Sequence, residues 1–105
     1  MLGENKSYTI KITETAWYML IIHARFLANV SVSAANGLID KFVETTDSLT
    51  SMPERNPWLE NEAIPFQKYR EILFGKYYMA LYEIRGNVVY INAVVDCRQD
   101  YSWLL

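Results

Sequence analysis

Hydrophobic and polar residues alternate near the start of the chain and then change to a helical spacing. Residues Tyr8 to Ile12 alternate strictly, which predicts a short strand. After Thr13 the apolar residues recur every three or four positions, which predicts a helix with Thr13 as its N-cap. A second amphipathic helix follows, capped by Ser31 or Ser33, and its core-facing positions are Ala35, Leu38, Ile39, Phe42, Thr46 and Leu49.

The second half of the chain has the pattern of a loop followed by strands. Residues Ser51 to Pro65 contain three prolines and predict a loop. Three strands are expected beyond it, joined by turns at Gly75-Lys76 and Gly86-Asn87, and they span Phe66 to Phe74, Tyr77 to Ile84, and Val88 to Cys97. The predicted order is β-α-α-β-β-β in one domain spanning residues 1–105. The predicted class is α+β, with a helical hairpin on one face of a mainly antiparallel sheet.

A two-residue turn at Gly86-Asn87 fixes which side chains of the last hairpin share a face. It places Tyr78, Ala80, Tyr82 and Ile84 opposite Val95, Ala93, Ile91 and Val89, an apolar face that must pack on the helices. The opposite, open face is mixed and has more apolar area than solvent exposure requires, which is typical of a binding surface.

A two-residue turn at Gly75-Lys76 would make a charged residue of the preceding strand face the core. It places Lys68, Arg70, Ile72 and Phe74 on the open face and turns the carboxylate of Glu71 toward the core. Two explanations are compatible with the sequence: either Glu71 lies beyond the covered area, or a bulge shifts the register.

Charge and composition narrow the functional classes. The net charge is −2 with a pI near 5.3, which counts against a strongly basic nucleic-acid surface. The start of the chain is polar where a signal peptide needs an apolar stretch, and the longest apolar run is interrupted by His23 and Arg25. Cys97 is the single cysteine and has no disulfide partner within the chain. We therefore expect a cytoplasmic protein without membrane contact.

Candidate chemistry is sparse. No phosphate-binding glycine loop or cluster of metal ligands is present in the sequence, so no cofactor and no metal are expected. His23 has no potential metal ligand three or four residues away and is expected at the surface of the helix or at its boundary with the core. Cys97 is expected to be a buried structural thiol, and Asp96 and Arg98 are spaced to form an ion pair.

Several short segments resemble the RelE/ParE toxin superfamily, whose members include plasmid stabilisation proteins. These are the opening strand followed by Ala16, the helical hairpin ending at Met52-Pro53, Tyr69-Arg70, the strand Tyr77–Tyr82, and Val94–Asp100 followed by Leu104-Leu105. The resemblance covers nearly the whole chain. It implies the toxin of a type II toxin–antitoxin system, which arrests growth until a cognate antitoxin protein neutralises it.

The superfamily contains two activities. RelE-like members cut messenger RNA on the ribosome, and this requires activation of a 2′-hydroxyl, stabilisation of the phosphorane and protonation of the leaving oxygen. Arg70 and Arg98 match basic positions of those enzymes, whereas Ile72 and Met79 replace an expected lysine and a central arginine. Tyr101 matches a tyrosine of the tail, but its spacing from Arg98 is shorter than in RelE-like enzymes.

These substitutions favour a ParE-like action, namely binding to a macromolecular target such as DNA gyrase. The alternatives are a ribosome-dependent ribonuclease that uses Arg70, Arg98 and Tyr101, and a decayed member that only binds an antitoxin. The protein is an enzyme only under the ribonuclease reading. The expected contact residues for the target or the antitoxin are Lys68, Arg70, Met79, Tyr90, Arg98 and Tyr101.

Overall fold

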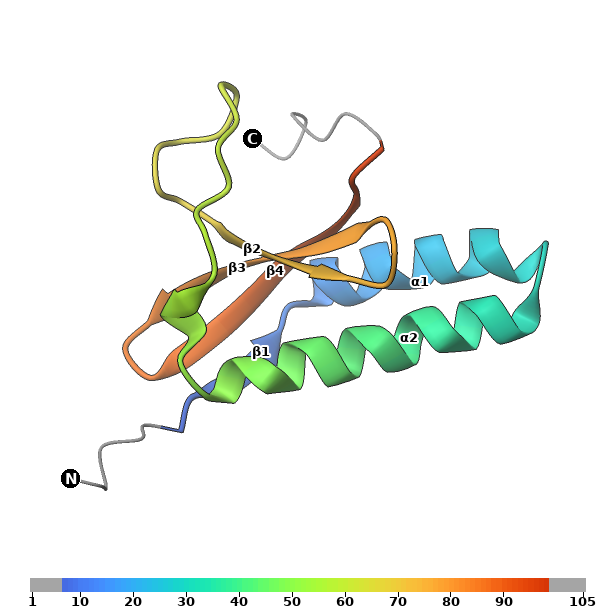
Figure 1. Ribbon diagram of the computed structural model, residues 1–105, viewed down its shortest axis with the longest axis horizontal. Coiled ribbons are helices and arrows are strands. Elements are labelled where there is room, and N and C mark those ends of the chain that lie inside the picture. Colours follow the sequence, from blue (N-terminus) through green and yellow to red (C-terminus); the bar gives the residue numbers. More distant parts are fainter. Residues whose placement is uncertain (1–6, 99–105) are drawn as a thin grey trace.

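The computed structural model describes residues 7–98, which form a helical hairpin and a four-stranded sheet (Figure 1). Two 3-10 turns, η2 (Ser48–Thr50) and η3 (Pro53–Arg55), follow the hairpin. The helices and strands, in chain order, are β1 (Thr9–Ile12), α1 (Glu14–Ala28), α2 (Val32–Asp47), β2 (Arg70–Phe74), β3 (Tyr78–Arg85) and β4 (Val88–Asp96). The predicted element order is therefore confirmed.

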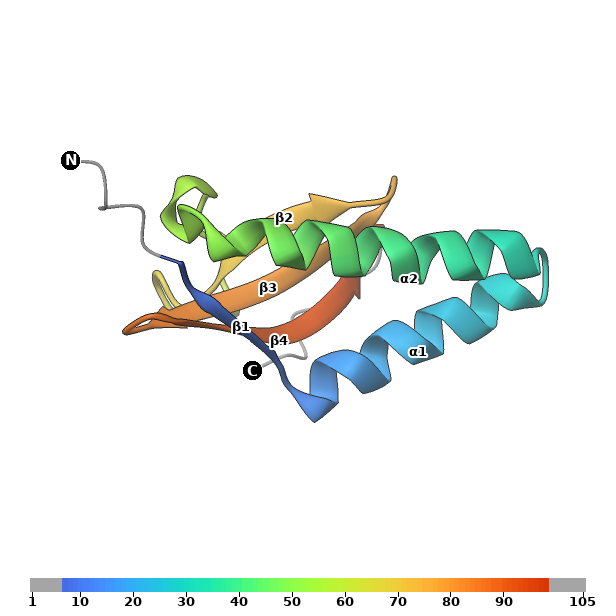
Figure 2. The same ribbon diagram turned by 90° about the horizontal axis from the view of Figure 1, so that it is seen from below.

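The sheet has the strand order β1-β4-β3-β2. β1 runs parallel to β4, whereas the β4–β3 and β3–β2 pairs are antiparallel. Both helices lie on the same face of this sheet, which is seen from the helix side in Figure 2. The predicted class, an α+β fold with a helical hairpin on a mainly antiparallel sheet, is confirmed.

Side-chain caps fix where the two helices begin. The hydroxyl of Thr13 accepts a hydrogen bond from the backbone N–H of Ala16 at 3.1 Å. Ser31, rather than Ser33, caps the second helix by accepting from the N–H of Ala34 at 3.1 Å. Each cap satisfies one of the backbone donors that a helix leaves unpaired in its first turn.

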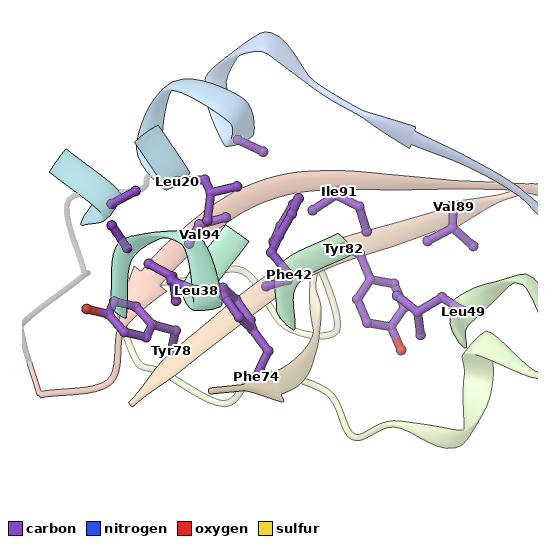
Figure 3. Packing of buried hydrophobic residues seen from close by; sticks show 14 of the residues in the cluster. Leu20, Leu38, Phe42, Leu49, Phe74, Tyr78, Tyr82, Val89, Ile91 and Val94 are labelled. Carbon is purple, nitrogen blue, oxygen red and sulfur yellow. The ribbon is translucent and has the colours of Figure 1, made fainter. Parts of the chain in front are cut away.

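The main core lies between the helices and the sheet (Figure 3). Phe42 of α2 is fully buried and contacts the ring of Phe74 edge-on, at a centroid separation of 5.5 Å. Phe74 in turn stacks with Tyr78 across the β2–β3 turn. Other buried members of the core include Leu20, Leu38, Leu49, Tyr82, Val89, Ile91 and Val94.

The register of the last hairpin was predicted correctly near its turn and wrongly beyond it. Ile84 pairs with Val89 and Tyr82 with Ile91, as expected. A β-bulge then follows, because Leu81 pairs with Ala93 and leaves Asn92 as the extra residue. An extra residue reverses the faces of all later side chains. Val94 and Asp96 therefore lie on the helix side, Ala93 and Val95 lie on the far side, and Cys97 is exposed rather than buried.

The second strand also departs from its prediction. It begins at Arg70 rather than Phe66, and Phe74 pairs with Tyr78, so the connection has three residues instead of two. Gly75 takes a φ of +61° at the start of that connection, a conformation that glycine adopts without strain. The extra residue turns Ile72 and Phe74 toward the main core and Glu71 away from it. The two-residue turn was therefore wrong, and the carboxylate of Glu71 does not face the main core.

Candidate functional site

A loop covers part of the sheet face opposite the helices. This cover loop, residues 56–69, rises from η3 and returns to β2 (Figure 1). It packs two apolar side chains on the strands and so creates a second core, made of Leu59, Ile64, Met79, Leu81, Ala93 and Val95. Met79 lies on the face predicted from the sequence but is only 5 % exposed. A partner would reach Met79 only by displacing the loop.

Tyrosine hydroxyl groups anchor the start of the cover loop. The hydroxyl of Tyr82 donates to the carbonyl of Pro53 at 2.6 Å and accepts from the side-chain amide of Asn56 at 2.9 Å. Tyr8 donates to the carboxylate of Glu54 at 2.9 Å. Burial raises the pKa of Tyr82, which keeps its hydroxyl protonated and able to donate.

Arg70 serves the same loop. Its Nη1 donates to the carbonyl oxygens of Glu54 at 3.0 Å and Asn56 at 2.7 Å. Its guanidinium also lies 3.9 Å from the ring centroid of Trp58, a close cation–π contact. These three contacts hold the loop against the edge of β2, which gives Arg70 a structural role whatever else it binds.

Lys68 and Tyr90 lie near this end of the sheet. Lys68 is exposed and lines a shallow hollow of about 320 Å³ together with Arg70, Trp58 and Glu83. Tyr90 pairs with Glu83 across the β3–β4 ladder, and the guanidinium of Arg85 lies 5.7 Å from its ring centroid. The structure therefore brings Lys68 and Arg70 together and places Tyr90 two strands away from β2.

Arg98 occupies the opposite end of the sheet and forms a bidentate ion pair with Asp96. Its Nε and Nη2 donate to the two carboxylate oxygens of Asp96 at 2.9 and 2.7 Å. The backbone N–H of Arg98 donates to the same carboxylate at 2.9 Å. The guanidinium also lies 4.1 Å from the ring centroid of Tyr77. The predicted pair is present, and the β4 bulge has carried its carboxylate to the buried side of the sheet.

Two titratable groups, His23 and Tyr78, lie beside this pair. The hydrogen bonds from Arg98 hold the pKa of Asp96 below its usual value. His23 packs edge-on against Tyr78 at 5.2 Å between ring centroids, and burial lowers the pKa of the imidazole although the charge of Asp96 acts in the other direction. His23 is therefore a half-buried residue at the boundary between α1 and solvent, as expected, and it is neutral at pH 7.

A groove opens next to Arg98, between the helical hairpin and the β2–β3 turn. Its volume is about 430 Å³, and apolar side chains such as Leu27 and Leu38 form its floor. Lys41, Lys76 and Arg98 also line the groove. Lys41 lies 3.6 Å from Glu44 and Arg98 is paired with Asp96, whereas Lys76 forms no ion pair with another described residue. Gly37 also borders the groove, and a Cβ at that position would meet no other atom within 4 Å. Sequence reasoning identified Arg98 but missed the groove, because its walls come from four separate segments.

The two arginines proposed from the resemblance are held apart. Arg70 pairs with Tyr82, whereas Asp96, which binds Arg98, pairs with Tyr78, so the two sites are separated by about 13 Å or more at ~3.3 Å per strand residue. Tyr101 lies outside the described residues. Within residues 7–98, no three potential metal-ligating side chains come together, and neither helix is long and apolar enough to cross a membrane.

Comparison with solved structures identifies the fold. A chain described as "Chromosomal ParDE TA system from P. aeruginosa" superposes with a TM-score of 0.70 at 15 % sequence identity. The alignment covers 87 % of this chain and 97 % of that chain. The chain has a ParE-like fold. The fold expected from the sequence resemblance is thereby confirmed.

The likeness to this solved structure is one of fold, at low sequence identity. No protein-family model matches the chain. No curated protein matches it either. At this level of identity the likeness establishes the arrangement of helices and strands, while the residues that act must be argued from this chain's own contacts.

Proposed function

We propose that the protein is the toxin of a type II toxin–antitoxin system and arrests growth by binding a macromolecular target, with DNA gyrase as the first candidate. The ParE-like fold supports a component of such a system. The intramolecular contacts of Arg70 and Arg98 favour target binding over RNA cleavage. Both guanidinium groups are engaged within the domain, at opposite ends of the sheet, so they do not converge on one phosphate.

The surroundings of Met79 support the same choice. RelE-like enzymes need a central basic group on this strand, and here a buried thioether packs against Leu59 and Ile64 of the cover loop. The loop leaves no room for a ribonucleotide at that position without a rearrangement of the second core. A nuclease would therefore need a different catalytic set from the one that the resemblance implies.

The groove beside Arg98 is the surface we assign to the antitoxin. An apolar lining beside the unpaired charge of Lys76 favours a segment that carries apolar anchors and an acidic residue. Lys76 lies on the rim, exposed, and makes only a distant contact of 5.3 Å with the ring of Tyr77. Lys76→Glu thus reverses charge at the rim with little cost to folding.

Induced expression in a bacterial host tests the proposal. Growth, DNA replication and messenger RNA integrity are followed separately after induction. We expect growth to stop with replication stalled and messages intact, and we expect purified protein to inhibit supercoiling by gyrase. Growth arrest with messages cut within codons would instead support the ribonuclease. Normal growth in the presence of soluble, folded protein would support a decayed member.

Two variants sharpen the test. If the protein is a ribonuclease, Arg98→Ala abolishes message cleavage, whereas under our proposal messages stay intact in both proteins. Lys76→Glu is expected to retain growth arrest but to be rescued less well by co-expression of the antitoxin gene. Lys11→Glu, an exposed charge reversal on β1 remote from the groove, is the matched control and should be rescued like the wild type.

A further inference from the structure

The outer face of α1 is unusually apolar for a helix on the surface of a domain. Figure 2 shows α1 and α2 side by side in front of the sheet, with no other described element lying over α1. The outward positions of α2 are mostly polar and include Asn36, Asp40, Lys41 and Glu44. The exposed large apolar residues of α1, in contrast, are Trp17, Tyr18, Ile21, Ile22 and Phe26. A contiguous exposed apolar surface of this kind marks an interaction site.

The order of residues along this face is self-complementary. In an antiparallel pair of α1 helices related by a twofold axis, residues at equal distances on either side of the axis face each other. With the axis between positions 19 and 20, Tyr18 of one copy faces Ile21 of the other, and Trp17 faces Ile22. All four positions are apolar and exposed. The α1 helices of the two copies thus contribute identical halves of one interface.

Charge follows the same symmetry. The same axis places Glu14 of one copy opposite Arg25 of the other, and the relation occurs twice in the pair. Both side chains are exposed, and neither forms an ion pair with another of the described residues. The positions 14, 18, 21 and 25 are separated by four, three and four residues, which is the spacing of a helix–helix seam. A parallel pair would instead bring like charges together.

We propose that α1 forms a twofold interface between two copies of this chain. Tyr18 and Phe26 are 66 % and 72 % exposed. Since an aromatic side chain can bury about 150–250 Å², these two alone supply roughly 200–350 Å² in each copy. Trp17, Ile21 and Ile22 raise this buried area further, toward the lower end of the range around ~800 Å² per partner that specific complexes bury. The dimer is therefore weak, with a dissociation constant on the order of micromolar.

Sedimentation of the full chain at concentrations from about 1 to 200 µM measures this equilibrium. The wild type is expected to shift from monomer to dimer across that range. Ile21→Glu places two carboxylates at the centre of the interface and should leave only monomer. Val43→Glu is the matched control, since Val43 is an exposed apolar residue of α2, and its dimer should dissociate as the wild type does.

A charge exchange tests the pairing itself. Glu14→Arg or Arg25→Glu alone places like charges opposite each other twice per dimer. Either change should raise the dissociation constant of the dimer about tenfold or more. The double variant restores opposite charges and should return to within about threefold of the wild type. A wild type that stays monomeric at every concentration would overturn the proposal. So would a dimer that Ile21→Glu leaves intact.

Discussion

Asp96 and Arg98 form the most fully bonded ion pair among the described residues. The carboxylate is buried and accepts three hydrogen bonds from Arg98, while the arginine side chain remains about half exposed. The pair closes the end of β4 beside His23 and Tyr78. Because the carboxylate has its hydrogen-bond partners only in the folded state, its ionisation is coupled to folding.

The pH dependence of stability follows from this coupling. The folded-state pKa of Asp96 is lowered, so its contribution to stability is complete above the unfolded value of about 3.9 and is lost as the pH falls through the folded value. Asp96→Asn should lower the free energy of unfolding at pH 7, and the difference from wild type should shrink below about pH 4. Denaturant unfolding between pH 7 and 3 measures this. Asp40→Asn, on the exposed face of α2, should leave the curve unchanged.

Tyr82→Phe isolates the anchor of the cover loop. The substitution removes a hydroxyl that joins Pro53 and Asn56 and leaves the carbonyl of Pro53 without that donor. We expect a loss of about 1–2 kcal/mol in the free energy of unfolding. Tyr77→Phe, at an exposed tyrosine outside the cover loop, should stay within about 0.5 kcal/mol of wild type. Equal losses in the two variants would contradict the anchoring role.

At the level of elements, local chemistry was predictable and sheet register was not. Helix starts were readable because Thr13 and Ser31 use their own hydroxyls to cap the helices. The β4 bulge could not be predicted from the sequence, because Val94 and Val95 are both apolar and either can face the helices. The length of the β2–β3 turn was equally hidden, since Tyr77 fits a strand as well as a loop.

The cover loop explains why Met79, which was expected to contact a partner, is buried. Alternation along β3 correctly gave its face, but nothing local shows that Leu59 and Ile64, far away in the sequence, return to cover that face. The same reason hid the groove, which unites residues of α1, α2, the β2–β3 turn and the end of β4. Features built from distant segments require the topology before they can be placed.

A cross-strand pair tests the cover. Met79 and Leu73 are directly opposite on the same sheet face, but Met79 is 5 % exposed and Leu73 is 66 % exposed. Met79→Arg buries an unpaired charge and should reduce the free energy of unfolding by about 3 kcal/mol or more. Leu73→Arg places the same side chain in solvent and should change it by less than about 0.5 kcal/mol. Similar effects in both variants would show that the loop does not seal Met79.

At the scale of the whole molecule, the three surfaces described above lie on different parts of the fold. α1 lies on one side of the sheet and the cover loop on the opposite side (Figure 1). The exposed apolar residues belong to α1, and the groove lies beside Arg98, between the helical hairpin and the β2–β3 turn. An antitoxin in the groove and a second copy on α1 therefore use different residues. Loss of dimerisation in Ile21→Glu should accordingly leave growth arrest measurable, which separates the two proposals.

The parallel pairing of β1 with β4 has a consequence for how the protein is made. β1 is synthesised first, yet among the described strands its only neighbour is β4, the last one. Ile10 therefore cannot form its pair with Val89 until β4 has been synthesised. A nascent chain that has formed both helices has no completed sheet on which to bury their apolar stripes. Pairing over such a sequence separation is slow. The protein thus reaches its folded form only when residues 88–96 have left the ribosome. Until then the apolar stripes of its helices are exposed and can bind other proteins.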